Sequence, residues 1–200
     1  RLDMLDGLAG NLWLDVEGVS DTALLRAIGR RYGLHELVVE GFANTDQRPK
    51  AEESGESLFV TLKMLRYNDE TREIVPEQLS MILCGQTLLT FQEGIEGDPF
   101  QAVRDRLQTP GSKVRERASG FLAYALLDAV VDNYFLVLEK LAARIEDLED
   151  EMTTRPEEEH LAELRAIKKE IIYMRRTVWP LRDMLSGLER TSGGLFGKET

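Results

Sequence analysis

The strongest constraint on this chain is a pair of long heptad patterns in its C-terminal half. In each pattern, apolar residues recur at alternating spacings of three and four, which is typical of helices that pack along one seam. The first pattern comprises Leu127, Val131, Tyr134, Leu138, Leu141, Ile145, Leu148 and Met152. The second comprises Leu164, Ile167, Ile171, Met174, Val178, Leu181, Leu185 and Leu188. The spacing therefore predicts two long helices whose apolar seams face each other.

Only a short segment, residues 153–156, separates the two patterns, and such a connection makes neighbouring helices antiparallel. Pro180 lacks a backbone N–H and predicts a kink in the second helix. Gly193 and Gly194 are expected to end that helix. We therefore predict an antiparallel helical hairpin over residues 119–192, with residues 193–200 starting a connection to later segments.

Residues 1–118 show a different pattern, in which short strand-like and helical segments alternate. Asn11 to Asp15 alternate as in a strand, and runs rich in β-branched and aromatic residues follow at 57–67, 78–83 and 87–91. Two helices are expected, at 23–31 and 100–107. Asp21 is the expected cap of the first helix, and Gly33 is its expected end. Asp98 and Pro99 are expected to start the second helix. Cys84-Gly85-Gln86 is the expected turn between the last two strands. The sequence predicts an α+β or α/β domain with a small mixed sheet and flanking helices.

Composition narrows the class of partner. The formal net charge of -11 opposes binding to nucleic acid or anionic lipid and favours cations. The longest uninterrupted apolar run, residues 121–127, has seven residues, well below the roughly 20 needed to span a bilayer. The single cysteine, Cys84, excludes an internal disulfide, and its apolar setting predicts a buried, unreactive thiol in a reducing compartment.

Motifs for enzymatic chemistry are missing from the sequence. His35 and His160 have no second His or Cys at zinc-ligand spacing. No P-loop surrounds Gly197-Lys198, and no Gly-x-Ser-x-Gly elbow occurs. We expect no catalytic residues.

Carboxylates gather in two settings. Acidic runs at 146–151 and 157–159 surround the hairpin turn, either as a solvated tip or as weak sites for hydrated divalent cations. Asp128 and Asp132 instead interrupt an apolar stretch and lie one helical turn apart, on one face. If buried, they would need a cation, a basic partner or a subunit boundary. Both a structural and a functional role remain open for this pair.

Several blocks of sequence, in order along the chain, resemble the CorA family of divalent-cation transporters. They are Gln47-Arg48-Pro49-Lys50, residues 58–65, Gln78-Leu79-Ser80, residues 89–93, Asp98-Pro99-Phe100 with Arg104, and residues 124–135 and 175–182. The resemblance covers nearly the whole chain. It implies a cytoplasmic α/β domain followed by long helices that lead to a pore.

The resemblance further implies a homopentamer in the cell membrane, with this part on the cytoplasmic side. The usual cargo is Mg²⁺, with Co²⁺ or Ni²⁺ also handled. The pore and its two transmembrane helices would lie beyond this sequence, so we expect membrane contact only through those missing C-terminal helices. We also expect the start of the α/β domain to be truncated. By this resemblance, the chain senses divalent cations and holds the pore closed when intracellular Mg²⁺ is high.

Three metal ligands are predicted. The resemblance assigns Glu40 and Asp128 to regulatory cation binding at a subunit contact, and the local pattern adds Asp132. Gly41 departs from the family, which commonly has an Asp there as a principal ligand. We therefore expect weak binding.

Three alternatives remain open. The same architecture serves zinc transporters of the CorA superfamily, and the missing pore residues would distinguish the two. A helical-hairpin module that binds a partner protein would show an exposed apolar stripe along the hairpin. A metal-dependent hydrolase that uses clustered carboxylates is the least favoured.

Overall fold

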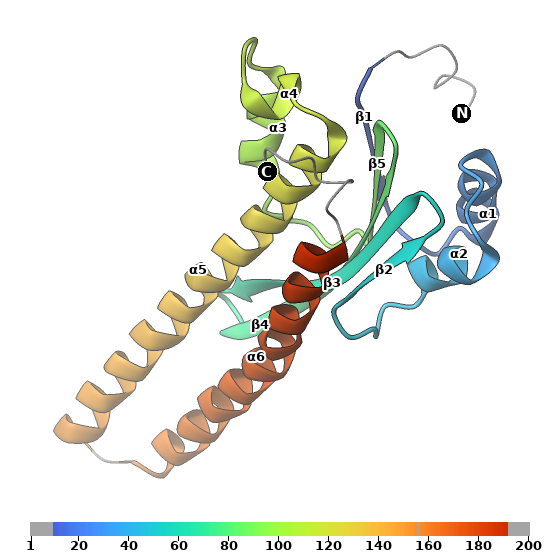
Figure 1. The fold of residues 1–200 in the computed structure, drawn as a ribbon. Helices are drawn as coiled ribbons and strands as arrows, with labels where there is room; N and C mark the ends of the chain where they lie inside the picture. The colour runs from blue at the N-terminus through green and yellow to red at the C-terminus, as the bar shows by residue number, and fades with distance from the viewer. Residues whose placement is uncertain (1–9, 156, 192–200) are drawn as a thin grey trace.

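A computed structural model of the chain describes residues 10–155 and 157–191 (Figure 1). Its elements are β1 (Leu12–Glu17), α1 (Thr22–Arg31), α2 (Glu36–Ala43), β2 (Lys50–Ser54), β3 (Ser57–Asn68), β4 (Glu73–Cys84), β5 (Thr87–Gln92), α3 (Gln101–Gln108), α4 (Lys113–Glu116), α5 (Ser119–Thr154) and α6 (Glu158–Thr191). The predicted fold is confirmed: a mixed sheet with flanking helices precedes a long antiparallel hairpin (Figure 1). Gly193 and Gly194 lie outside the described residues.

The sheet has the strand order β1-β5-β4-β3-β2, with β1 parallel to β5 and the other pairs antiparallel. β4 begins five residues earlier than predicted and contains Pro76. A proline is unfavourable in a central strand because it has no N–H for the ladder. Here β5 pairs with β4 only from Leu79 onward, so Pro76 lies on a part of β4 that has a strand on one side alone.

Each face of the sheet has its own core. On one face, Leu58, Val60 and Leu62 of β3 pack with α5, α6 and α3 in one buried cluster. On the other face, Phe59 of β3 packs with the residues of α1 and α2 in a second cluster. Figure 1 shows α1 and α2 on one side of the sheet and the two long helices on the other. The alternation of side chains along a strand thus produces a three-layer arrangement.

Local signals placed most helix ends correctly. The Asp21 carboxylate accepts a hydrogen bond from the Leu24 N–H at 3.0 Å, and Gly33 has a φ of +63° after the last turn of α1. The predicted helix at 100–107 begins at Gln101 instead, because Phe100 is its cap residue. Asp98 nevertheless accepts from the Phe100 N–H at 3.0 Å.

Three elements were not predicted: β2, α2 and the four-residue helix α4. β2 has the sequence Lys-Ala-Glu-Glu-Ser, which has little β propensity. It forms because it pairs with the strongly apolar β3 along its whole length. α2 is a short helix, and it packs against α1 where a Cβ on Gly29 would come within 2.4 Å of Val39 Cγ2. Such close contact is set by tertiary packing and leaves no periodic signal in eight residues.

The predicted seams are right in half of their positions. Leu127, Tyr134, Leu141 and Leu148 are buried on α5, and Ile167, Met174, Leu181 and Leu188 are buried on α6. The alternate positions are divided: Leu138, Leu164, Ile171 and Leu185 are 40–47% exposed, whereas Val131, Ile145, Met152 and Val178 are half-buried. The buried stripe instead includes the residues that directly precede several of the alternate positions: Val130, Val137, Arg144, Thr177 and Met184. Because some interior positions are polar, an apolar pattern could not find this stripe.

Arg144 is the main polar residue inside the hairpin. Its guanidinium donates to Glu163 of α6 at 2.6 Å and to the Arg72 carbonyl oxygen at 2.6 Å. The hydrogen bond with Arg144 lowers the pKa of Glu163 and raises the pKa of Arg144. This ion pair therefore joins both long helices to the β3–β4 turn.

By length and composition, α5 could also cross a membrane, with a mean hydropathy of 1.6 over its most apolar 18 residues. Of that window, 44% is buried inside the structure. Leu126, Val130 and Tyr134 are part of the core next to the sheet, and a core helix of this kind passes the same test. The composition of α5 is thus weak evidence for a membrane span.

Cys84 is half-buried rather than buried. Its sulfur lies 3.1 Å from the Ser57 hydroxyl oxygen, across the β3–β4 pair. Burial raises the pKa of the Cys84 thiol, which agrees with the expectation of an unreactive group.

Candidate functional site

Glu40 lies on α2 with an exposed side chain. It lines a groove of about 370 Å³ between α1 and α2. Arg26 and Arg30 of α1 and Glu36 of α2 line the same groove, over an apolar floor. The groove therefore presents charges of both signs around Glu40.

Asp128 and Asp132 lie on α5, and both are exposed. The burial that would have made an unpaired carboxylate costly is therefore absent in the single chain. Neither carboxylate is in an ion pair or a side-chain hydrogen bond with another residue in the described ranges 10–155 and 157–191. Exposed apolar neighbours surround them, with Tyr124 46% and Phe135 60% exposed. The face of α5 that bears the two aspartates is thus open to another molecule.

The structure does not bring all three predicted ligands together. Glu40 is on α2 and the two aspartates are on α5, and these helices lie on opposite sides of the sheet (Figure 1). Asp128 and Asp132 remain one turn apart on a single helix. A site that included Glu40 and Asp128 would therefore need two copies of the chain.

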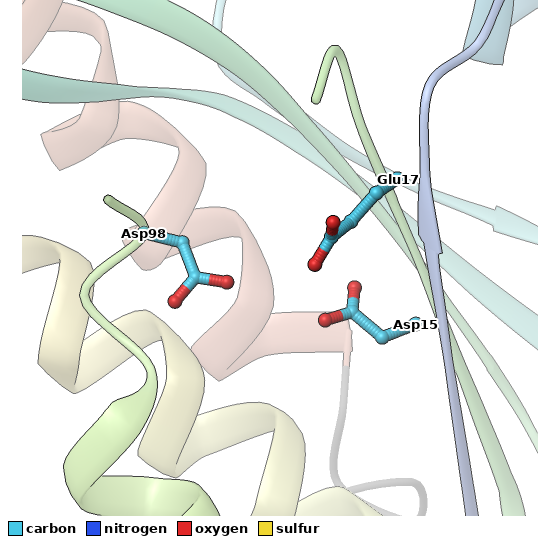
Figure 2. A group of neighbouring side chains, drawn as sticks. All are labelled: Asp15, Glu17 and Asp98. Atoms are coloured by element: carbon cyan, nitrogen blue, oxygen red, sulfur yellow. The ribbon is translucent and has the colours of Figure 1, made fainter. Parts of the chain in front are cut away.

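A different carboxylate cluster, which sequence reasoning missed, lies at the end of the β1–β5 pair. Asp15 and Glu17 of β1 and Asp98 of the loop before α3 point toward one another (Figure 2). One oxygen from each lies within 4.8 Å of the others. The available signals were weak: Asp15 and Glu17 are two apart on one strand face, and Asp98 was assigned only as a helix cap.

Arg104 of α3 neutralises much of this cluster. Its two terminal nitrogens donate to Asp98 at 2.7 and 2.5 Å, and one of them donates to Asp15 at 2.8 Å. Gln92 and Thr90 also donate to Asp15, at 2.9 and 2.6 Å. The carboxylate oxygens of Asp15 and Asp98 are thus already bound by donors from the chain itself.

The electrostatics of the cluster reflect these bonds. Burial raises the pKa of Asp98, but the hydrogen bonds from Arg104 and from the Phe100 N–H outweigh it, so the pKa of Asp98 is lowered. The hydrogen bond to Asp98 raises the pKa of Arg104. At neutral pH, the network is an ion pair that fastens α3 to the sheet.

The β5–α3 loop beside the cluster is held by a second carboxylate. Glu77 of β4 accepts from the N–H groups of Gly94 and Ile95 at 2.9 and 3.1 Å. Burial raises the pKa of Glu77 more than these two hydrogen bonds lower it. The loop and α3 are therefore positioned by acidic groups that serve structural roles.

Residues 9–200 match the model of the family described as CorA-like Mg²⁺ transporter protein. The chain belongs to this family. The cobalt/magnesium transport protein CorA of Thermotoga maritima is 39% identical over 188 residues, which are 94% of this chain and 53% of that relative. The chain thus spans about half the length of this CorA protein. The family comprises transporters and not enzymes, so membership excludes the hydrolase alternative.

Solved structures of the CorA family share this fold. The soluble domain of CorA from Methanocaldococcus jannaschii has a TM-score of 0.78 at 21% identity, covering 94% of this chain and 73% of that one. The cytoplasmic domain of ZntB from Vibrio parahaemolyticus has a TM-score of 0.73 at 13% identity, covering 94% and 72%. Identities this low indicate the fold alone and do not distinguish the two kinds of transporter.

Within this CorA-family fold, Mg²⁺ fits the predicted carboxylates better than the cluster in Figure 2. Mg²⁺ prefers oxygen ligands and keeps several of its waters, so exposed carboxylates such as Asp128 and Glu40 suit it. At the cluster, an ion would have to displace Arg104, which holds two of the three carboxylates. We therefore regard the cluster as part of the scaffold.

Proposed function

We propose that this chain is the cytoplasmic, divalent-cation-sensing part of a CorA-type Mg²⁺/Co²⁺ transporter. The observation that carries the proposal is the match of residues 9–200 to the family, with 39% identity to a cobalt/magnesium transport protein over 94% of the chain. In this proposal, the complete protein is a homopentamer in the cell membrane, and the chain lies on its cytoplasmic side. The net charge of -11 favours cations as the regulatory ligand.

The sensor sites are proposed to form between neighbouring subunits. Glu40 and Asp128 lie on opposite sides of the sheet, so a contact in which one subunit's α2 meets the next subunit's α5 would bring them together. Asp132, one turn from Asp128, would add a second carboxylate from the same helix. A cation bound there stabilises the assembled state in proportion to its preference for it.

Gly41 weakens this site because it contributes no side-chain oxygen. A Cβ added there would lie 3.6 Å from Phe59 Cζ and 3.8 Å from Gln47 Nε2, which are ordinary contact distances. The backbone at position 41 therefore has room for a Cβ, and Gly41→Asp supplies a direct test.

The test uses the complete transporter in vesicles, with Mg²⁺ flux measured against internal Mg²⁺. Asp128→Asn should raise the internal Mg²⁺ concentration needed for inhibition, and Gly41→Asp should lower it. Glu139→Gln removes one exposed charge from the same helix and is the matched control. If both variants are inhibited like the parent, the sensor role of these positions is wrong.

A helical-hairpin interaction surface is the second candidate function. The exposed apolar stripe that it requires is present: Phe135, Leu138, Leu164, Ile171 and Trp179 are 42–72% exposed. In the pentamer proposed above, other parts of the complete protein would cover this stripe.

We expect the isolated chain to be a monomer or weak oligomer. A stable pentamer in sedimentation at low micromolar concentration without divalent ions would contradict this expectation.

A further inference from the structure

The groove between α1 and α2 bears two arginines that have no acidic partner in the part of the chain that the structure describes. Arg26 and Arg30 line its α1 wall one helical turn apart, and both are exposed. Neither guanidinium is in an ion pair with another residue in the ranges 10–155 and 157–191. Because the chain carries a net charge of -11, an unpaired basic pair of this kind favours an acidic partner.

The floor of this groove is apolar and is fixed by the fold. Leu25 and Val39, both buried, and the half-buried Leu34 form the floor. Leu25 and Val39 also belong to the core on this face of the sheet. The volume of about 370 Å³ lies in the range that receives an organic group rather than a single ion. The groove therefore suits a protein surface that combines acidic and apolar side chains.

The exposed face of α5 has the complementary pattern. Asp128 and Asp132 are also one turn apart, so their spacing equals that of the two arginines on α1. The exposed rings of Tyr124 and Phe135 flank them on the same face, at spacings of four and three residues. When such a face lies along α1, two ion pairs form in register, and an aromatic ring is close to the apolar floor.

A single copy of the chain cannot make this contact. The core that contains Leu25 of α1 lies on one face of the sheet, and the core that contains Val130 of α5 lies on the other (Figure 1). A contact between two different surfaces of identical chains is heterologous, and it closes into a ring when the rotation between neighbours allows. The partner that fits the groove is therefore α5 of a second copy of this chain.

The second wall of the groove shows why the arginines are needed. Glu36 and Glu40 of α2 line it, on the opposite side from Arg26 and Arg30. A neighbouring α5 would bring two more carboxylates next to these glutamates, and like charges at this distance repel one another. The two arginines offset this repulsion without a bound cation.

We propose that Arg26 and Arg30 of one subunit form ion pairs with Asp128 and Asp132 of the next subunit, so that this contact exists before any cation binds. The inference rests on the proposed function, because it concerns the α2–α5 contact between subunits of the complete transporter. Exposed ion pairs are individually weak, so these pairs orient neighbouring subunits and do not by themselves assemble the pentamer. A cation bound by Glu40 then strengthens a contact that the arginines have already formed.

The test is a zero-length cross-link in the complete transporter. Arg26→Lys together with Arg30→Lys keeps both charges and supplies amines, which a water-soluble carbodiimide joins to carboxylates in direct contact. Divalent ions are first removed with a chelating resin, and the cross-linked peptides are identified by mass spectrometry. We expect position 26 or 30 to be joined to position 128 or 132 of another copy, and the yield to fall at high salt.

Two controls show whether the cross-link reports this contact. Arg106→Lys in the parent places an amine at an exposed position of α3 outside the groove, and it should give no cross-link to position 128 or 132. Adding Asp128→Asn and Asp132→Asn to the double lysine variant should abolish the cross-link, because the carboxylates that react are then missing.

A cross-link that forms only after Mg²⁺ is added would overturn the proposal, because the cation and not the arginines would then hold the contact. No cross-link in either condition would overturn it as well.

The flux experiment distinguishes this failure from failure of the proposed function. If Asp128→Asn raises the internal Mg²⁺ needed for inhibition but no cross-link forms, the cation site stands and the arginine contact is wrong. If the cross-link forms without Mg²⁺ but Asp128→Asn and Gly41→Asp are inhibited like the parent, the arginine contact stands and the sensor role is wrong.

Discussion

The sheet and the outer half of the helical hairpin are built on different principles. Large aromatic residues around the sheet, namely Phe42, Phe91 and Phe100, are at most 1% exposed. On the hairpin, Leu138 and Leu164 are 46% and 47% exposed, and an arginine occupies the buried stripe. The sheet is covered on both faces by its own chain, whereas each long helix buries only one stripe.

The difference shows where the chain depends on its own packing and where it can meet other molecules. A core covered on both faces loses stability when any buried side chain is shortened. A helix with an exposed apolar side is tolerant of change there in the isolated chain. In the proposed transporter, that exposed side is available for contacts between subunits or with later segments.

The largest expected effect comes from shortening a side chain in the core of the sheet. Leu62 of β3 is fully buried, so Leu62→Ala should lower the free energy of unfolding by about 2 to 5 kcal/mol. Leu164→Ala makes the same change on the exposed side of α6 and should stay within about 0.5 kcal/mol. Urea unfolding followed by circular dichroism measures both. Similar losses in the two variants would show that the hairpin is packed as tightly as the sheet.

A smaller effect is expected at the polar residue inside the hairpin. Arg144→Met leaves Glu163 and the Arg72 carbonyl oxygen without their donor and should cost about 1 to 3 kcal/mol. Adding Glu163→Leu should restore part of the loss, because the carboxylate that lost Arg144 is then removed as well. Lys140→Met breaks an exposed ion pair on the same helix and should change the unfolding midpoint little. A double variant no more stable than Arg144→Met would mean that charge pairing is not what Arg144 contributes.

The smallest effect on stability is expected at the cluster of Asp15, Glu17 and Asp98, and it tests whether this cluster has a structural role. Since the pKa of Asp98 is lowered in the fold, the unfolded chain binds its proton more tightly, and the stability that Asp98 contributes is lost as pH falls through its folded pKa. Asp98→Asn should therefore lower stability by about 1 to 2 kcal/mol at neutral pH, and the difference should shrink as pH falls below the ordinary pKa of an aspartate, about 3.9.

The control for Asp98→Asn is Asp105→Asn, which neutralises an exposed carboxylate on α3. Thermal unfolding of the parent and both variants across this pH range makes the comparison. A difference between parent and Asp98→Asn that is the same at every pH would show that the ion pair with Arg104 is not its source.

The sequence was sufficient to predict the layout of the chain. Seven-residue periodicity identified the hairpin and alternation identified β1, because one buried face repeats at a fixed interval in each case. Runs rich in β-branched and aromatic residues identified β3, β4 and β5. Asp21 and Gly33 marked the ends of α1 for local reasons, a side-chain hydrogen bond and a left-handed backbone. These features depend on residues close together in the chain.

Tertiary structure alone decided the rest. Which side of each long helix is buried depended on Arg144 and Thr177, polar residues whose burial requires partners elsewhere in the fold. The cluster of Asp15, Glu17 and Asp98 formed because β1 pairs with β5 in parallel across some 75 residues of sequence. The separation of Glu40 from Asp128 followed from the sheet that lies between their helices. Contacts between distant segments depend on how layers stack, and no spacing along the chain encodes that.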